Sequence, residues 1–371
     1  MCDIAIFGGG PAGAACAISL RLNFPQWRVA VFEASDYSHP RTGEILPGAA
    51  ISLLRQLRVP LEILSDCSMV AESVASSWGQ DDLAEQHHLF SARGRGFHLD
   101  RNAFDCHLAD IADAMGATVH CNTRFRSALR ENGEWRIELS GGRTCGALFL
   151  IDATGRSASV ARAQGASVHH FDHLTAYSRF FDGLPSTEHQ TVIEACALGW
   201  WYTAPLPNGR RVASLLTDND LGREAGLPTV EAWDRSLRRT HHIAPLLDEA
   251  SQDSHATSAP ASTAVLSSFG GDGWRATGDA VASCDPLAGQ GITSALRSGI
   301  LASYATADAL LGKSSTGLQR YEAILRAQFT GFRRQHRVHH DRERRWRDQP
   351  FWQRRQSAID GECIASVKAA R

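Results

Sequence analysis

The sequence predicts an α/β fold, α+β overall, in which a Rossmann-type parallel sheet carries an inserted mixed β-sheet and a helical C-terminal tail. Three observations support this prediction. An apolar strand at residues 4–7 leads into a glycine loop and an alanine-rich helix. Residues 192–217 are enriched in β-branched and aromatic residues, as strands are. From about residue 316 the chain has a helical pattern rich in arginine and tryptophan, and 371 residues suffice for two cores.

The N-terminal strand, loop and helix form a dinucleotide-binding pattern. The loop reads GGGPAG at residues 8–13, and a second apolar strand ends in Glu33, twenty residues beyond the last glycine. The first glycine forms the tight turn, the third lets the backbone approach a pyrophosphate, and the last lets the helix pack on the strand. An acid at this distance accepts hydrogen bonds from a ribose. The predicted contacts to the cofactor are those of Gly8, Gly10, Ala12, Gly13 and Glu33.

Further elements follow from periodicity and from end signals. Asp100 is a predicted N-cap of a helix that ends near residue 114, and residues 50–57 and 229–240 also have a helical pattern. Residues 41–47 read RTGEILP and are predicted to form a loop, because glycine and proline interrupt them. Residues 218–220 are a predicted turn. The predicted strands are residues 118–120, 135–139, 148–151, 192–195, 199–204 and 211–217.

Composition excludes several classes of protein. The only lysines are Lys313 and Lys368, so the chain has neither a P-loop nor a lysine Schiff base in its N-terminal two-thirds. The nine cysteines form no CxxC pair and the sixteen histidines are scattered, which predicts free thiols, a reducing compartment and no metal site. No apolar run approaches the roughly twenty residues of a membrane span, and the first strand leaves no room for a signal peptide. We therefore expect a cytoplasmic protein with no membrane contact.

The net charge of −2 conceals an uneven distribution. Residues 313–371 carry 14 basic and 6 acidic side chains, or +8, so residues 1–312 carry 24 basic and 34 acidic, or −10. A basic tail can contact nucleic acid, an acidic partner or its own acidic body. We favour the last of these and expect no nucleic acid as a partner.

Two further segments make the cofactor specific. Residues 152–155 read DATG, and residues 276–296 read ATGDAVASCDPLAGQGITSAL. With the glycine loop, they resemble the three cofactor segments of flavin monooxygenases of the p-hydroxybenzoate hydroxylase type, in the same order. The resemblance implies bound FAD and O2 as a co-substrate. Because the sequence has no second dinucleotide pattern, it also implies an external electron donor, either NAD(P)H or a reductase.

The same resemblance gives roles to single residues. It implies that Asp279 hydrogen-bonds the ribityl chain of FAD, that Arg101 lies near the phosphates and that Arg41 lies over the flavin. A helix that starts beside the flavin would stabilise negative charge on its reduced form. The residues implied to lie against the isoalloxazine are Pro286, Gly289 and Gly291.

We predict a discontinuous organisation of the chain. The FAD-binding domain takes in residues 1–75, 93–160 and 264–312. The substrate domain takes in residues 76–92 and 161–263, and residues 313–371 form the helical tail, rich in arginine and tryptophan.

Residues 199–206 read GWWYTAPL, which is similar to the GWxWxIP signature of flavin-dependent tryptophan halogenases. Tyr202 stands where the second tryptophan of the signature should be. Those halogenases also need an N-terminal lysine to relay hypohalous acid, and no lysine precedes Lys313. The chemistry therefore favours hydroxylation. We predict that Trp200, Trp201 and Tyr202 line a substrate pocket, with ordinary packing in a strand core as the alternative.

The tail narrows the resemblance. Residues 343–355 read ERRWRDQPFWQRR and residues 217–221 read TDNDL. With the tryptophan segment, they resemble flavoproteins of the LodB, GoxB and QhpG kind, which mature tryptophan-derived quinone cofactors. The resemblance implies hydroxylation of a tryptophan side chain in a partner protein, the precursor of a quinone-dependent oxidase or dehydrogenase. The alternative for the tail is a structural one, in which its arginines pair with acidic surface and Trp346 and Trp352 fill a groove.

Oxygen transfer to an indole carbon depends on positioning, exclusion of water and proton delivery, so no nucleophile or metal is required. Glu44, in the RTGEILP loop, is our candidate acid or base, and a plain surface carboxylate is its alternative. Other functions remain open: a small-molecule aromatic hydroxylase, a halogenase-like flavoenzyme, a prenyl-chain reductase, or a non-catalytic flavin-binding maturation chaperone.

Overall fold

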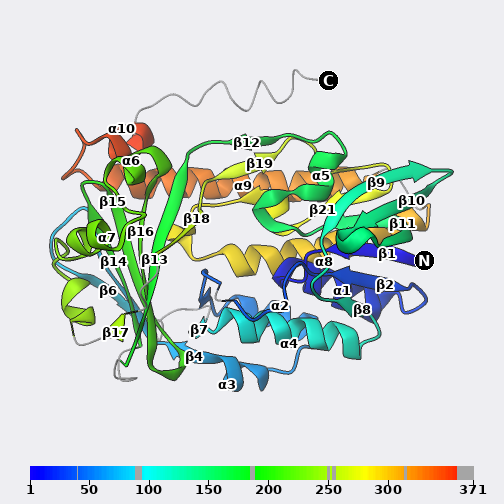
Figure 1. The fold of residues 1–371 in the computed structure, drawn as a ribbon, viewed down its shortest axis with the longest axis horizontal. Helices are drawn as coiled ribbons and strands as arrows, with labels where there is room; N and C mark the ends of the chain where they lie inside the picture. Colours follow the sequence, from blue (N-terminus) through cyan, green and yellow to red (C-terminus); the bar gives the residue numbers. More distant parts are fainter. Residues whose placement is uncertain are drawn as a thin grey trace.

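A computed structural model gives the fold in Figure 1. It describes residues 1–39, 41–87, 94–183, 189–248, 251–252, 256–312 and 316–356. Two large sheets lie side by side, with helices around the first and the long helix α9 running along the molecule past both (Figure 1). The predicted fold class is confirmed. Within the described residues, no helix combines the length and the apolar character that crossing a membrane requires.

The first sheet is built around parallel strands in the order β21-β11-β1-β2-β8. Strand β2 is buried at all four positions, as expected for a parallel strand covered on both faces. The antiparallel strand β20 lies at one edge, and the hairpin β9–β10 pairs with β11. The strands are β1 (Cys2–Phe7), β2 (Val29–Phe32), β8 (Thr118–His120), β9 (Phe125–Glu131), β10 (Glu134–Leu139), β11 (Thr144–Asp152), β20 (Gly270–Gly271) and β21 (Trp274–Ala276).

Helices α1 and α8 pack tightly against each other beside this sheet. A Cβ on Gly299 of α8 would lie 2.3 Å from the carbonyl oxygen of Ala12 in α1, so only glycine allows this approach. Asp100 accepts hydrogen bonds from the backbone N–H groups of Asn102 and Ala103, which confirms it as the N-cap of α4. The helices of this region are α1 (Pro11–Asn23), α2 (Ala50–Gln56), α3 (Ile63–Cys67), α4 (Arg101–Ala114), α5 (Ser159–Ala163) and α8 (Gly291–Leu310).

The second sheet is mixed and has the order β17-β13-β16-β15-β14-β5-β6, with β18 also paired to β13. Strand β5 comes from the N-terminal part of the chain and runs parallel to β14. The predicted turn at residues 218–220 is instead the end of β16 and the start of α6. The elements are β5 (Ser73–Ser77), β6 (Ala84–His87), β13 (Leu174–Asp182), β14 (Gln190–Cys196), β15 (Gly199–Leu206), β16 (Arg210–Asp218), β17 (Ser251–Gln252), β18 (Thr257–Pro260), α6 (Asn219–Glu224) and α7 (Val230–Leu237).

Two small antiparallel sheets, β3-β7-β4 and β12-β19-β22, complete the body. The predicted loop at residues 41–47 contains strand β3, because Ile45 and Leu46 pair with β7. In Figure 1, α10 lies beside α6 at the end of α9. The elements are β3 (Ile45–Leu46), β4 (Ser68–Ala71), β7 (Gly96–Leu99), β12 (Val168–His170), β19 (Ala264–Leu266), β22 (Ala282–Ser283), α9 (Thr316–Arg342) and α10 (Pro350–Gln356).

Candidate cofactor and substrate site

The glycine loop has one position that the protein itself leaves open. A Cβ on Gly8, where φ is +105°, would lie 2.1 Å from the carbonyl oxygen of Ala153, and a Cβ on Gly13 would lie 1.9 Å from that of Gly8. No heavy atom lies within 4 Å of a Cβ built on Gly10. Packing therefore requires Gly8 and Gly13, whereas Gly10 leaves room for a ligand. Helix α1 begins there with neither a side-chain cap nor an acidic residue in its first turn, which suits a pyrophosphate.

Glu33 is held in place at the end of β2. It is buried, and its carboxylate accepts hydrogen bonds from the backbone N–H of Gly9 at 2.7 Å and from the hydroxyl of Ser35 at 2.6 Å. Burial alone would raise the pKa of Glu33, but these hydrogen bonds and the charge of Arg41 lower it below its usual value. The carboxylate is therefore an acceptor at neutral pH, which suits the hydroxyls of a ribose.

The two predicted arginines share one buried carboxylate. Arg41 and Arg101 lie 3.1 and 3.0 Å from the same oxygen of Asp105, which is fully buried. Arg41 also donates to Glu33 at 2.9 Å, so the structure places it at the Glu33 end of the site. Arg101 instead donates to the carbonyl oxygens of Thr42 and Gly43. The resemblance implied that Arg41 lies over the flavin; in the structure its side chain contacts Glu33 and Asp105, and the flavin contact stays a prediction.

Asp279 lies beside α1 and is partly exposed. Its neighbour Gly278 has φ of +62°, and a Cβ there would lie 2.6 Å from the Cβ of Ala12. The side chain of Asp279 keeps 41 % of its surface exposed, and its nearest charged partner is Arg156 at 3.6 Å. Burial raises the pKa of Asp279, while Arg156 and Arg101 lower it. An exposed carboxylate beside the start of α1 is compatible with the ribityl contact predicted for Asp279, which stays a prediction.

The loop before α8 is shaped by Asp285. Its Oδ1 accepts a hydrogen bond from the backbone N–H of Leu287 at 2.9 Å, which closes a turn over Pro286–Ala288. Gly289 follows in the left-handed region with φ of +59°. No heavy atom lies within 4 Å of a Cβ built on Gly291, where α8 begins without a side-chain cap. The positive end of α8 therefore faces open space, as contact with a reduced flavin requires.

Glu44 is buried beside this loop. Glu44 is 3 % exposed. A Cβ built on Gly289 would lie 3.6 Å from the side chain of Ile45, the residue that follows Glu44. The Tyr202 hydroxyl donates to Oε2 of Glu44 at 3.3 Å, while Oε1 has no hydrogen-bond partner among the residues that the structure describes. Burial raises the pKa of the Glu44 carboxyl, and burial together with Glu44 raises the pKa of Tyr202 well above 10. The hydrogen bond therefore joins Tyr202 of the second sheet to Glu44, the residue before β3, and leaves Oε1 of Glu44 buried.

The three aromatic residues predicted to share a pocket do not all face the same way. Trp200 and Tyr202 lie on the face of β15 that packs with Leu287 of the flavin loop. Trp201 points to the other face, where its ring meets that of Trp233 edge-on at 5.0 Å. The structure thus separates Trp201 from the other two, and we leave it out of the candidate site. The alternation of side chains along a strand was the signal for this division.

The tail is anchored to the second sheet. Trp352 is fully buried and its indole N–H donates to the carbonyl oxygen of Cys196 at 2.8 Å. Arg355 lies 2.7 Å from Asp218, and Arg354 lies 2.9 Å from Asp218 and 2.7 Å from Asp220. The predicted pairing of tail arginines with the acidic body is confirmed. It joins the PFWQRR and TDNDL segments, and the tail covers the Trp200 face of the sheet.

Comparison with known proteins agrees with this geometry. A family model for the FAD binding domain matches residues 1–330. LodB of Marinomonas mediterranea, described as an FAD-dependent oxidoreductase, is 31 % identical and the match covers 95 % of this chain and 96 % of LodB. The myxobacterial chondrochloren halogenase CndH superposes with a TM-score of 0.85 at 21 % identity, covering 100 % of this chain and 89 % of CndH. The peptidyl tryptophan dihydroxylase QhpG superposes with a TM-score of 0.73 at 25 % identity, covering 98 % and 80 %.

Proposed function

We propose, from the premise that this chain belongs to the FAD binding domain family and is a flavin-dependent monooxygenase, that its substrate is a tryptophan side chain of a partner protein. The partner is the precursor of a quinone-dependent oxidase or dehydrogenase. The product is a hydroxylated tryptophan that proceeds to a tryptophylquinone. The co-substrates are O2 and an external electron donor, either NAD(P)H or a reductase.

The observation that carries this proposal is the similarity to LodB along almost the whole length of both chains. It covers 95 % of this chain, so it extends past residues 1–330, which the family model matches. QhpG, whose fold this chain shares, acts on a peptidyl tryptophan. The missing lysine argues against halogenation, because the first 312 residues offer no amine to carry hypohalous acid.

The residues present fit FAD along its whole length. Gly10 and the start of α1 would hold the pyrophosphate, Glu33 the ribose, Asp279 the ribityl chain, and the start of α8 the flavin ring. Bound FAD supplies the electrons that activate O2. The protein holds the indole in place, keeps water out and moves protons.

Glu44 is the residue we assign to proton transfer. Attack of oxygen on an indole carbon leaves a proton on that carbon, and the ring regains aromaticity when a base removes it. The free Oε1 of Glu44 is such a base, held by the Tyr202 hydroxyl on its other oxygen. Its raised pKa brings proton exchange closer to neutral pH than for an exposed glutamate.

The decisive test combines the protein, an electron donor and a candidate precursor of a quinone-dependent oxidase or dehydrogenase, followed by mass spectrometry of the precursor. We expect one or two added oxygen atoms on a tryptophan, with labelled oxygen incorporated from 18O2. Precursor left unchanged while the flavin turns over would overturn the proposal. Flavin oxidation that is indifferent to every substrate would instead favour the chaperone alternative.

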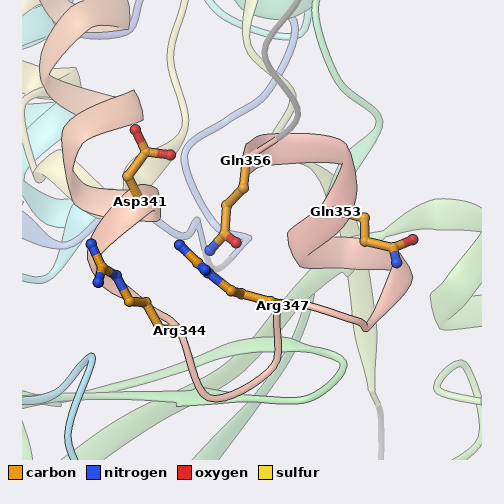
Figure 2. A pocket seen from close by; sticks show the side chains of 5 residues that line it. All are labelled: Asp341, Arg344, Arg347, Gln353 and Gln356. Carbon is orange, nitrogen blue, oxygen red and sulfur yellow. The ribbon is translucent and has the colours of Figure 1, made fainter.

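A basic pocket on the tail supports a protein substrate. Asp341, Arg344 and Arg347 meet Gln353 and Gln356 of α10 around a cavity of about 450 Å³ (Figure 2). Both arginines are exposed, and within the described part of the chain neither has an ion pair or hydrogen bond. Arg354 and Arg355, by contrast, form ion pairs with Asp220 and Asp218 of the same chain. The pocket fits an acidic segment of the partner.

Reversing these two charges should weaken capture of the precursor without altering the flavin. For Arg344→Glu/Arg347→Glu we expect KM for the precursor to rise about tenfold or more at low salt, with kcat unchanged. The reason is that electrostatic attraction between the two proteins speeds their association and does not act on the chemical step. The difference should shrink as salt is added. Arg124→Glu/Arg126→Glu makes the same charge change at two exposed positions, one just before β9 and one within it, and is the matched control. Equal KM values for the two double variants would contradict the prediction.

A further inference from the structure

Three potential metal ligands converge outside the residues that we assign to FAD and substrate. Asp285 comes from the turn before α8, and His336 and His340 come from α9. Each brings one ligand atom to the cluster, and these atoms all lie within 4.8 Å of one another. Asp285 and His340 are buried, and the side chain of His336 is 17 % exposed. Solvent therefore reaches the cluster at the partly exposed His336, while the other two residues are buried.

The positions of these residues are fixed by the local structure. His336 and His340 lie one turn apart on α9, so both face the same way, and their ring centroids are 4.1 Å apart. Asp285 uses Oδ1 to cap its own turn and presents Oδ2 to α9. There the Nε2–H of His336 donates to Oδ2 at 2.7 Å. Two imidazoles and a carboxylate are thus already assembled.

His340 carries the strongest sign of a missing ligand. Its Nδ1 lies 3.0 Å from the carbonyl oxygen of His336, and because a carbonyl only accepts, Nδ1 bears the proton. Nε2 then holds a lone pair, yet it is buried and, within the described part of the chain, has no hydrogen-bond partner. A buried acceptor without a donor costs free energy. A ring N–H bonded to a backbone carbonyl is also the arrangement that orients histidines in metal sites.

We propose that Asp285, His336 and His340 bind a divalent transition-metal cation, with Zn²⁺ as the ion. Two imidazole nitrogens and one carboxylate form a ligand set that zinc uses, with water in the remaining position. Binding would replace the hydrogen bond between His336 and Asp285 with a bond from each of these side chains to the ion. The nearby guanidinium of Arg355 is neutralised by Asp218 at 2.7 Å. The ion would tie α9 to the turn that leads into α8.

The test uses full-length, FAD-loaded protein without an affinity tag. The protein is stripped with a chelator, incubated with Zn²⁺, passed through a desalting column and assayed for zinc by mass spectrometry. We expect about one zinc per chain and a melting temperature that rises with zinc concentration. For His336→Ala and Asp285→Asn we expect the affinity to fall at least about tenfold. His339→Ala removes an exposed histidine next to the cluster and should bind zinc like the wild type.

His340→Ala is not the deciding variant, because it would open space in the core. His336 is partly exposed, and its replacement leaves the buried ring in place. FAD content and circular dichroism check that each variant is folded. Wild-type protein that retains no zinc, or a folded His336→Ala that retains as much as His339→Ala, would overturn the proposal. Neither result bears on the tryptophan substrate, since the zinc assay involves no turnover.

Discussion

Glu44→Gln should lower the rate of substrate hydroxylation by about 10²–10⁴-fold while leaving FAD content and flavin reduction unchanged. Glutamine keeps the size of the side chain and still accepts a hydrogen bond from Tyr202, but it cannot take a proton. In the wild type Glu44 is 3 % exposed, and none of the described residues donates a hydrogen bond to its Oε1.

The pH dependence gives an independent readout of the same residue. Because burial raises the pKa of Glu44 above 4.5, its base form is lost as pH falls through that raised value. The wild-type rate should therefore rise with pH on the acid side, and Glu44→Gln should lack this limb. Glu72→Gln, at an exposed glutamate, is the control. Hydroxylation by Glu44→Gln within about threefold of the wild-type rate would refute the assignment.

Tyr202→Phe separates positioning from proton transfer. It removes the 3.3 Å hydrogen bond to Oε2 and leaves the carboxyl of Glu44 in place. We expect a smaller loss than for Glu44→Gln, since the base remains and only its orientation is less fixed. The fall in rate at low pH should persist but shift to higher pH. The hydrogen bond from Tyr202 lowers the pKa of Glu44, so its loss would raise that pKa further.

The parts of the site that depend on neighbours in sequence were predictable. The glycine loop, the acid at its fixed distance and the Asp100 cap are local patterns, and each has the predicted position in the fold. The orientation of Trp201 was also predictable from the sequence. Side chains alternate along a strand, so Trp201 lies on the opposite face from Trp200 and Tyr202. Grouping the three by their motif obscured that signal.

The contacts that the sequence did not reveal join distant segments. Arg41 meets Asp105 through a helix whose rotation no local pattern specifies. The backbone N–H of Gly79 donates to the buried carboxylate of Glu343, which lies 264 positions along the chain. The spacing of His336 and His340 was visible as i and i+4 on a helix, but Asp285 comes to them only through tertiary packing. Such pairings follow from how helices and sheets dock, and periodicity carries no information about that.

Gly10→Ala and Gly13→Ala should fail in opposite ways, although they lie three residues apart in one loop. A Cβ on Gly13 would lie 1.9 Å from the carbonyl oxygen of Gly8, so the backbone must shift and the protein should lose its fold or much of its thermal stability. A Cβ on Gly10 meets no atom within 4 Å, and its φ of −72° suits alanine, so the apoprotein should melt like the wild type. The added methyl group then occupies space that the pyrophosphate needs. An overpacking cost of about 1–3 kcal/mol corresponds to FAD affinity about 5–150-fold weaker.

Gly331→Ala on α9, another position where a Cβ meets nothing, should leave FAD binding unchanged. Titration of each apoprotein with FAD, followed by flavin fluorescence, measures the difference, and wild-type affinity in folded Gly10→Ala would place the pyrophosphate elsewhere.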